Sequence, residues 1–229
     1  MKKPHMIEVR QLSHDFDGLP VLRDISLQLA EKRIAIIGNN GSGKSTLARM
    51  LNALLLPRRG EVAVDGILTH LDAAHVRRLV GYVFQNPEHQ IVMPTLEEDL
   101  AFGLWNMNLA KPAIRERVDA MLKAHGLEGK RASPAHLLSG GEQKLLTLLS
   151  VLVMEPRYIV FDEPMNSLDL VTRRRFAGVM DSLTQTVITI THDYDLIANY
   201  DRAILIHEGR VAADGSPAEA VRRYLEIVG

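Results

Sequence analysis

The sequence predicts an α/β fold with a mostly parallel core sheet, and three features of its pattern support this prediction. Short, continuous apolar runs recur along the chain, as in strands that are buried on both faces. Segments with helical features separate most of these runs, so each crossover can return the next strand in parallel. A long middle segment contains no such run, which indicates a helical subdomain inserted into the core.

The first part of the chain predicts a small antiparallel sheet. Ile7–Leu12 and Ile25–Leu29 alternate apolar and polar residues, as half-buried strands do. Asp17–Pro20 lies between them and has the composition of a turn. We therefore expect an N-terminal antiparallel β subdomain.

The apolar runs that follow predict the buried strands. The first, Arg33–Ile37, precedes a glycine-rich loop and a helix expected from about Ser45 to Leu55, which Pro57 stops. Further strands are expected at Val80–Phe84, Tyr158–Phe161, Thr186–Thr191 and Ala203–Ile206.

The middle of the chain, about residues 95–154, predicts the inserted helical subdomain. One of its helices has an apolar face formed by Ile114, Val118, Met121 and Leu122, and Gly126 is suited to end it. We interpret residues 1–229 as a single domain of this kind.

Composition excludes several classes of protein and of site. The chain has 229 residues, a net charge of -1 and no cysteine, so a broad nucleic-acid surface, disulfides and thiolate metal sites are not expected. No apolar run follows the lysines at the N-terminus, so no signal peptide is expected. The most apolar stretch, Leu145–Met154, is shorter than the roughly 20 residues of a membrane span. We expect a chain that is soluble alone and reaches a membrane only through a partner.

A phosphate-binding loop is the strongest motif. Gly38–Thr46 fits G-x-x-x-x-G-K-[ST] and lies between a buried strand and a helix, as the motif requires. Glycines let backbone N–H groups approach phosphates, Lys44 supplies charge to the β- and γ-phosphates, and the Ser45 hydroxyl can ligate Mg²⁺. An incidental glycine-rich turn would leave Lys44 and Ser45 unexplained. The predicted ATP-binding residues of the loop are Gly38, Asn39, Asn40, Gly41, Ser42, Gly43, Lys44, Ser45 and Thr46.

Two acids end a later buried strand. Asp162 is expected to hold Mg²⁺, and Glu163 is the candidate general base for the attacking water. The alternative is that these two acids form a solvated strand end. The presence of a phosphate loop in the same chain makes this alternative weaker.

The segment Leu138–Gln143 resembles the signature motif of ABC ATPases. Lys44, Gln85, Ser139, Asp162 and His192 follow one another in the order of that family, and the resemblance covers essentially the whole chain. It implies a P-loop NTPase fold of the ABC type, with ATP and Mg²⁺ as cofactors.

The resemblance also implies roles for single residues. Phe16 matches the aromatic residue that stacks on adenine, although a core aromatic is the alternative. Gln85 matches the glutamine that senses the γ-phosphate and contacts Mg²⁺. Asp169 lies in the D-loop, and His192 matches the switch histidine that follows a buried strand.

The signature motif opens a second helix, expected over about Glu142–Met154, whose N-terminus can bind an anion. Within one chain it is expected to lie too far from Lys44 to help. ABC proteins resolve this by head-to-tail dimerisation, so a second ATPase subunit, in a homodimer, is the expected partner. Ser139, Gly140, Gly141 and Glu142 would then act on the partner's ATP.

Four positions depart from the common family pattern without removing a catalytic group. Glu142 replaces a common Gln, and Leu145 replaces an Arg. Met165 stands where Thr is usual, and Leu170 stands where Pro often follows the D-loop.

Phe84–Gln90 and Pro94–Gly103 resemble a narrower group, the energy-coupling-factor (ECF) ATPases, which drive vitamin and transition-metal uptake in prokaryotes. Gln90–Pro94 is more similar to the biotin-uptake members than to the cobalt members, which carry a Phe-Ser pair before the proline. Biotin is therefore the expected solute, and a cobalt or nickel importer is the alternative. A non-transport ABC ATPase is a third hypothesis. After Pro217 we expect no C-terminal extension like that of many relatives.

This resemblance implies two membrane partners. One is a transmembrane coupling protein, and the other is a substrate-binding membrane protein that it contacts. The chain would lie at the cytoplasmic face of the prokaryotic inner membrane. Glu88, Glu97, Glu98 and Asp99 are the candidate docking residues for basic ends of the coupling protein's helices. A solvated helix start is the alternative, and we expect at least one of these acids to serve as a cap or face solvent.

Overall fold

The computed structural model describes residues 5–229, and their contacts divide the chain into two compact units. The core unit consists of the residues up to Tyr82 together with Arg157–Pro164 and Leu183–Gly229. The helical unit consists of Val83–Pro156 and Met165–Ser182. The fold is the predicted α/β type, with an antiparallel N-terminal sheet and a mostly parallel second sheet.

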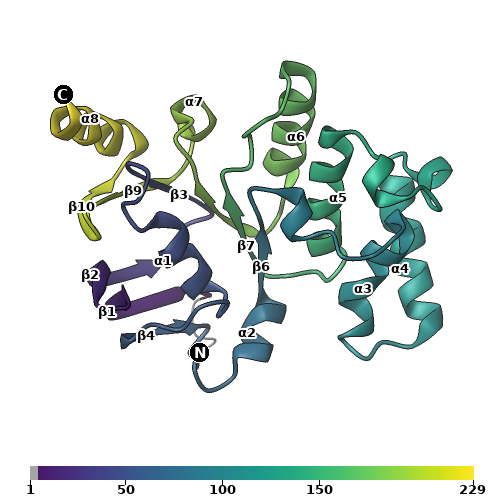
Figure 1. The fold of residues 1–229 in the computed structure, drawn as a ribbon, viewed down its shortest axis with the longest axis horizontal. Coiled ribbons are helices and arrows are strands. Elements are labelled where there is room, and N and C mark those ends of the chain that lie inside the picture. The colour runs from purple at the N-terminus through teal and green to yellow at the C-terminus, as the bar shows by residue number, and fades with distance from the viewer. Residues whose placement is uncertain (1–4) are drawn as a thin grey trace. The chain divides into compact units, whose positions relative to one another are not determined.

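The first sheet of the core unit is antiparallel and has the strand order β2-β1-β4-β5 (Figure 1). Asp17 and Gly18 join β1 to β2 and both have positive φ, the conformation that a tight hairpin turn requires. The four strands are β1 (Ile7–Phe16), β2 (Leu19–Leu29), β4 (Arg59–Val64) and β5 (Ile67–Leu68).

The second sheet has the order β10-β9-β3-β8-β7-β6. Its centre is parallel, since Ile36 of β3 pairs with Ile190 of β8 and with Ile204 of β9. β10 pairs with β9 in the antiparallel direction, so the sheet is mixed at this edge. The strands are β3 (Arg33–Ile37), β6 (Val80–Val83), β7 (Tyr158–Asp162), β8 (Thr186–Ile190), β9 (Arg202–His207) and β10 (Arg210–Gly215).

The first helix of the core unit is shorter than predicted. It ends at Leu51 rather than Leu55, because Ala53 adopts a left-handed conformation with φ 58°. The N–H groups of Leu54 and Leu55 turn back to the carbonyl of Arg49 and satisfy it in place of a further helical turn. The helices of this unit are α1 (Lys44–Leu51), α2 (Ala73–Leu79), α7 (Tyr194–Ile197) and α8 (Pro217–Val228).

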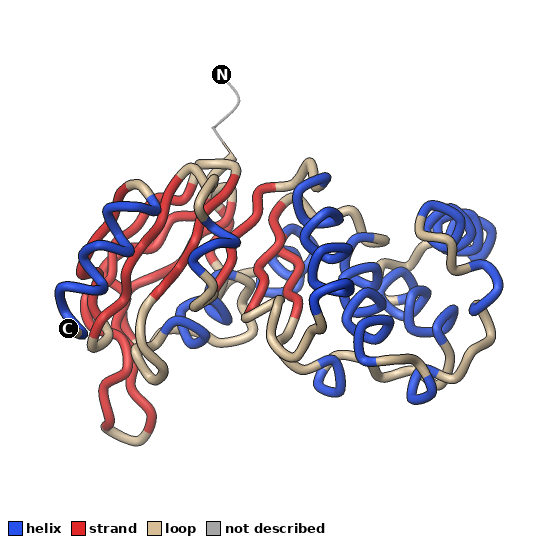
Figure 2. Tube along the Cα trace, turned by 90° about the horizontal axis from the view of Figure 1, so that it is seen from above, coloured by secondary structure: helices blue, strands red, loops and turns tan. Residues whose placement is uncertain are grey.

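The helical unit contains the segment 95–154 together with residues 83–94 and a further helix, and Figure 2 draws it as blue helices joined by tan loops. Ile114, Val118 and Leu122 are buried in one apolar cluster, as their spacing predicted. Gly126 has φ 67°, and the Leu127 N–H bonds the Leu122 carbonyl, which closes the end of that helix. The elements are η1 (Pro87–His89), α3 (Leu96–Trp105), α4 (Lys111–Ala124), η2 (Glu128–Lys130), η3 (Ala135–Leu137), α5 (Gly140–Leu152) and α6 (Leu170–Ser182).

Among residues 5–229, no helix combines the length and the apolar character needed to cross a lipid bilayer.

Candidate functional site

The phosphate loop joins β3 to α1 in the core unit, and two of its glycines are required by close packing. A Cβ on Gly38 would lie 2.0 Å from the Ile206 carbonyl oxygen, and one on Gly43 would lie 2.7 Å from Leu22 Cδ2. Both residues also have positive φ. Gly43 caps α1 without a side-chain hydrogen bond, so the first N–H groups of the helix stay open to an anion.

Lys44 lies inside this loop and is only 6% exposed. Its Nζ donates to the Gly38 and Asn39 carbonyls, at 2.7 and 2.8 Å. Burial lowers the pKa of Lys44, and the Glu163 and Asp162 carboxylates oppose that shift. A phosphate group would supply the counter-charge that two carbonyls do not.

The Ser42 hydroxyl is a second sign of a ligand at the loop. It is buried and has no hydrogen-bond partner within the described residues. Because an unpaired buried hydroxyl is costly, a phosphate oxygen bonded to it would remove the penalty.

Two oxygen ligands for a cation meet beside the loop. Ser45 Oγ donates to Asp162 Oδ1 at 2.9 Å, which is about the separation of neighbouring ligands around an octahedral Mg²⁺ with bonds of about 2.1 Å. Asp162 is 4% exposed at the end of β7. A hydroxyl and a carboxylate of this kind fit the hard-oxygen ligand set of Mg²⁺.

Tyr82 holds this carboxylate in place, and the sequence reasoning missed it. Its hydroxyl donates to Asp162 Oδ2 at 2.8 Å. Burial and the neighbouring Asp162 raise the pKa of Tyr82 well above its usual range, so the proton stays on the phenol. The only available signal was a polar-tipped aromatic within a buried strand.

Glu163 and His192 form the third part of the core-unit site. His192 Nδ1 lies 2.9 Å from Glu163 Oε2. Glu163 has φ 48°, and its N–H bonds the Ile190 carbonyl at the end of β8. This backbone conformation is costly for a non-glycine residue and is concentrated at functional sites. The pair places a carboxylate and an imidazole within one hydrogen bond of each other.

Phe16 ends β1, and its ring is available for stacking. The residue is 48% exposed. The His14 ring meets it edge-on, with ring centroids 4.8 Å apart, and so limits its orientation.

The signature residues begin α5 in the helical unit. Ser139 is the N-cap: its Oγ accepts from the Glu142 N–H at 3.3 Å, and the Glu142 carboxylate accepts from the Ser139 N–H at 3.0 Å. Hydrogen bonds from Lys130 and from the Ser139 backbone lower the pKa of Glu142. The Glu that replaces the common Gln therefore completes a charged capping box. Gly140, the first residue of α5, is exposed.

Gly141 allows α5 to approach α6 closely, since a Cβ there would lie 2.5 Å from Thr172 Cγ2. Asp169 precedes α6 and accepts from the Val171 and Thr172 N–H groups and the Thr172 hydroxyl. The Thr172 N–H and hydroxyl are the main cause of the lowered pKa of Asp169. Asp169 thus caps the start of α6.

A buried lysine fixes the backbone around Gln85, and it was not predicted. Lys144 of α5 is 1% exposed, and its Nζ donates to the Gln85 carbonyl at 2.7 Å and to the Phe84 carbonyl at 3.1 Å. Leu145, one of the four departures from the family pattern noted above, is packed in the apolar core. Met165 is also buried, whereas Leu170 is exposed.

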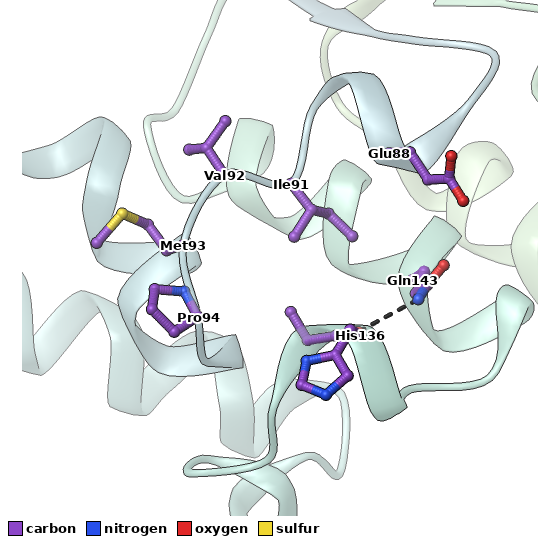
Figure 3. A pocket seen from close by; sticks show the side chains of 8 residues that line it. Glu88, Ile91, Val92, Met93, Pro94, His136 and Gln143 are labelled. Carbon is purple, nitrogen blue, oxygen red and sulfur yellow. Dashed lines mark hydrogen bonds between the residues drawn. The ribbon is translucent and has the colours of Figure 1, made fainter.

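The loop after Gln85 lines a groove of about 490 Å³ (Figure 3). The groove is lined by an apolar stretch together with polar side chains. Within the apolar stretch, Val92 is 60% exposed. Figure 3 shows Glu88 at one end of the groove and His136 at another. The lining residues are Glu88, Ile91, Val92, Met93, Pro94, Ala135, His136 and Gln143.

The four candidate docking acids have different environments. Glu88 is exposed beside the groove, and Glu97 pairs with Arg131 at 2.6 Å. Glu98 completes a capping box with Thr95 at the start of α3, the cap that we expected among these acids. Asp99 is 4% exposed and so cannot contact a partner directly. Its carboxylate is already engaged, because it accepts from two loop N–H groups and a serine hydroxyl.

Comparisons with known proteins agree with one another. A family model described as "ABC transporter" matches residues 22–166. A putative ABC transporter ATP-binding protein of Deinococcus radiodurans is 52% identical over 96% of this chain and 98% of its own. The biotin transport ATP-binding protein BioM of Rhodobacter capsulatus is 40% identical over 96% of this chain and 94% of its own. The structure of cbiO1 from Clostridium perfringens, part of the ABC transporter complex cbiONQ, aligns with TM-score 0.83 and 32% identity over 99% of this chain and 94% of that one.

Proposed function

The chain belongs to the ABC transporter family and is one of its ATP-hydrolysing subunits, and from that premise we propose that it energises an importer of the energy-coupling-factor type. The similarity to the energy-coupling factor transporter ATP-binding protein EcfA1 of Caldanaerobacter subterraneus, 43% identical over 89% of this chain and 76% of its own, carries this proposal. The similarity to cbiO1, part of the ABC transporter complex cbiONQ, supports a role as one subunit of a transporter complex. In this proposal residues 1–229 act as one ABC ATPase domain with an inserted helical subdomain.

Biotin is the solute that we propose. The loop Gln90–Pro94 and the BioM relative favour it, whereas a cobalt import ATP-binding protein of Syntrophus aciditrophicus, 44% identical over 93% of this chain, keeps cobalt or nickel uptake as the second candidate. Deleting the gene and measuring uptake of radiolabelled biotin and of radioactive cobalt separates the two. Loss of biotin uptake alone is expected. Unchanged uptake of both solutes would contradict both solute assignments.

In the proposed ATPase site, the phosphate loop binds the nucleotide and Phe16 stacks on adenine. Ser45 and Asp162 would hold Mg²⁺, which would supply charge neutralisation at the phosphates, and the match of Gln85 to a Mg²⁺-contacting glutamine stays a prediction. Glu163 takes the proton of the attacking water as the γ-phosphoryl group leaves ADP. His192 orients the Glu163 carboxylate from 2.9 Å.

We propose that a second copy of the chain completes this site. In this proposal Ser139, Gly140, Gly141 and Glu142, at the capped start of α5, face the partner's ATP. Asp169, at the start of α6, would lie at the same subunit interface.

The groove after Gln85 is the proposed docking site for a basic helix end of a transmembrane coupling protein. Its apolar lining suits a helix, and the exposed Glu88 supplies complementary charge. Through that protein the ATPase would serve a substrate-binding membrane protein, at the cytoplasmic face of the prokaryotic inner membrane. Asp99 supports the groove from inside, since it accepts from the Val92 N–H at 3.0 Å and from the Ser150 hydroxyl at 2.8 Å.

Charge reversal at Glu88 tests the docking proposal better than reversal at Glu98, which would also break a helix cap. Glu88→Lys should abolish co-purification with the membrane subunits and leave basal ATP hydrolysis unchanged. Glu128→Lys, at an exposed acid outside the groove, is the matched control. Full assembly of the Glu88→Lys protein would contradict docking at this groove.

A further inference from the structure

The last helix of the core unit contacts the phosphate loop through one side chain. α8 packs on β9 and β10 and touches α7 (Figure 1). The Tyr224 hydroxyl of α8 donates to Asn39 Oδ1 at 2.5 Å. Asn39 lies in the loop that cradles the phosphates, and its carbonyl accepts from Lys44 Nζ at 2.8 Å. The same residue is thus held by Lys44 on its backbone and by α8 on its side chain.

Tyr224 also contacts the segment that follows the switch histidine. Its ring and that of Tyr194 lie 5.8 Å apart between centroids, at an angle of 55°. Tyr194 is the first residue of α7 and lies two positions after His192. Both rings pack against the apolar cluster that anchors α8 on the sheet.

The Tyr224 side chain therefore makes two contacts of different kinds. An amide oxygen can only accept, so the Tyr224 hydroxyl donates to Asn39, while the Tyr224 ring packs against Tyr194. Burial and the neighbouring Tyr224 side chain raise the pKa of Tyr194 to about 12, so its proton is retained at neutral pH. One side chain of α8 thus contacts both the phosphate loop and the segment after His192.

We propose that Tyr224 is a positioning residue of the ATPase site, which couples the phosphate loop to the His192 segment through α8. When Lys44 turns toward a phosphate, its bonds to the Gly38 and Asn39 carbonyls weaken. The Tyr224 hydroxyl then keeps the Asn39 side chain in position, and the ring contact with Tyr194 keeps the segment after His192 in position. The proposal depends on ATP hydrolysis alone and does not depend on the importer assignment or its solute.

The test uses the full chain with Mg-ATP. Tyr224→Phe keeps the ring packing and removes the hydroxyl. The KM for ATP and the Kd for a fluorescent ATP analogue should rise about two- to tenfold, the range for loss of one neutral hydrogen bond. Tyr194→Ala removes the ring that packs against Tyr224 and should have a smaller effect in the same direction, because the Tyr224 hydroxyl can still donate to Asn39.

A double-mutant cycle separates coupling from packing. If the two residues act together, adding Tyr224→Phe to Asn39→Ala should change nucleotide affinity by much less than it does in the wild type. Leu225→Ala, at a 58% exposed position of the same helix, should leave KM unchanged. Tyr158→Phe, which removes a 2.6 Å hydroxyl bond to Asp65 elsewhere in the core unit, should lower thermal stability without changing KM.

Two results would overturn the proposal. One is a Tyr224→Phe protein with wild-type KM and Kd, whatever its melting temperature, since that assigns Tyr224 to packing. The other is strict additivity of the Asn39→Ala and Tyr224→Phe effects. Because the assay measures nucleotide binding and hydrolysis rather than transport, a wrong importer assignment would not alter either outcome.

Discussion

Glu163 has φ 48°, a conformation that costs a non-glycine residue about 1–3 kcal/mol. Its N–H is tied to Ile190 of the neighbouring strand, and its carboxylate lies beside His192. The hydrogen bond to the neighbouring strand maintains the strained conformation of Glu163. This conformation places the Glu163 carboxylate at the end of β7. We infer that this strain serves the chemistry of the site.

Replacing this carboxylate by an amide tests its role as the general base. Glu163→Gln should slow ATP hydrolysis by about 10²–10⁴-fold, equivalent to about 3–5 kcal/mol of barrier, while ATP still binds. Glu208→Gln is the matched control, because Glu208 also has positive φ but lies at an exposed turn. Single-turnover hydrolysis and nucleotide binding measure the two effects. A Glu163→Gln protein with near wild-type turnover would remove the base assignment.

Lys144 is a buried cation that donates to the backbone carbonyls of two consecutive residues, Phe84 and Gln85. Lys144→Met would leave those carbonyls without their charged donor. We expect a loss of about 1.5–3 kcal/mol in the free energy of unfolding, together with slower hydrolysis through displacement of Gln85. Lys144→Arg should recover part of both, and calorimetry with a steady-state assay measures them.

The control for this change is Lys123→Met, at an exposed lysine of α4. It should leave stability and turnover within error of the wild type. If Lys144→Met behaved in the same way, Lys144 would be no more than a filler of the apolar core.

At the scale of elements, Asp65 connects the two sheets of the core unit. It lies between β4 and β5 and accepts from the Tyr158 hydroxyl of β7 at 2.6 Å and from Arg157. Burial opposes ionisation, but these hydrogen bonds outweigh it and lower the pKa of Asp65. A carboxylate whose pKa is lower in the folded state stabilises the fold above its unfolded pKa of about 4, and the stabilisation is lost as pH falls through the folded pKa.

This linkage predicts the effect of Asp65→Asn on the acid limb of the stability profile. The variant should be less stable than the wild type near neutral pH, and the difference should shrink as the pH falls below about 4. Asp17→Asn, in the exposed turn between β1 and β2, is the control and should follow the wild-type profile. Urea unfolding at a series of pH values measures this, and a pH-independent difference would exclude the carboxylate as its cause.

At the scale of the whole molecule, the groups proposed to act in hydrolysis are divided between two units of the chain. The core unit brings together Lys44, Asp162, Glu163 and His192, whereas Ser139 begins a helix of the helical unit. A site shared between two copies predicts a specific pattern in mixed dimers. Lys44→Ala subunits combined with Ser139→Arg subunits yield one site with both lesions and one with neither, so partial ATPase activity should return on mixing.

Each variant alone, as a homodimer, has a lesion in both sites and should be inactive, which provides the control. Activity is measured after mixing at a fixed total concentration. Failure of any mixture to exceed its parents would mean that Ser139 acts on the nucleotide of its own subunit, or that hydrolysis at one site is insufficient. A nucleotide-bound dimer structure with Ser139 beside Lys44 of the other chain would select between these.

The sequence by itself determined the fold class and most of the core-unit site. Gly38–Thr46 and the strand that ends in Asp162 and Glu163 are local patterns, and their geometry follows from strand, loop and helix propensities over a few residues. The antiparallel opening was predicted for the same reason. α1 was predicted four residues too long, because the reversal at Ala53 carries no glycine or proline signal.

Only the tertiary structure decided which polar groups meet across the sequence. Tyr82 bonds Asp162 from 80 residues away, and Tyr224 bonds Asn39 from 185 residues away. Asp99, predicted as a candidate docking residue, is buried because α3 packs on α5, and the Ser150 hydroxyl donates to its carboxylate. Such contacts depend on which elements pack together, and helical or strand periodicity specifies only the face that a residue occupies, not the partner that covers it.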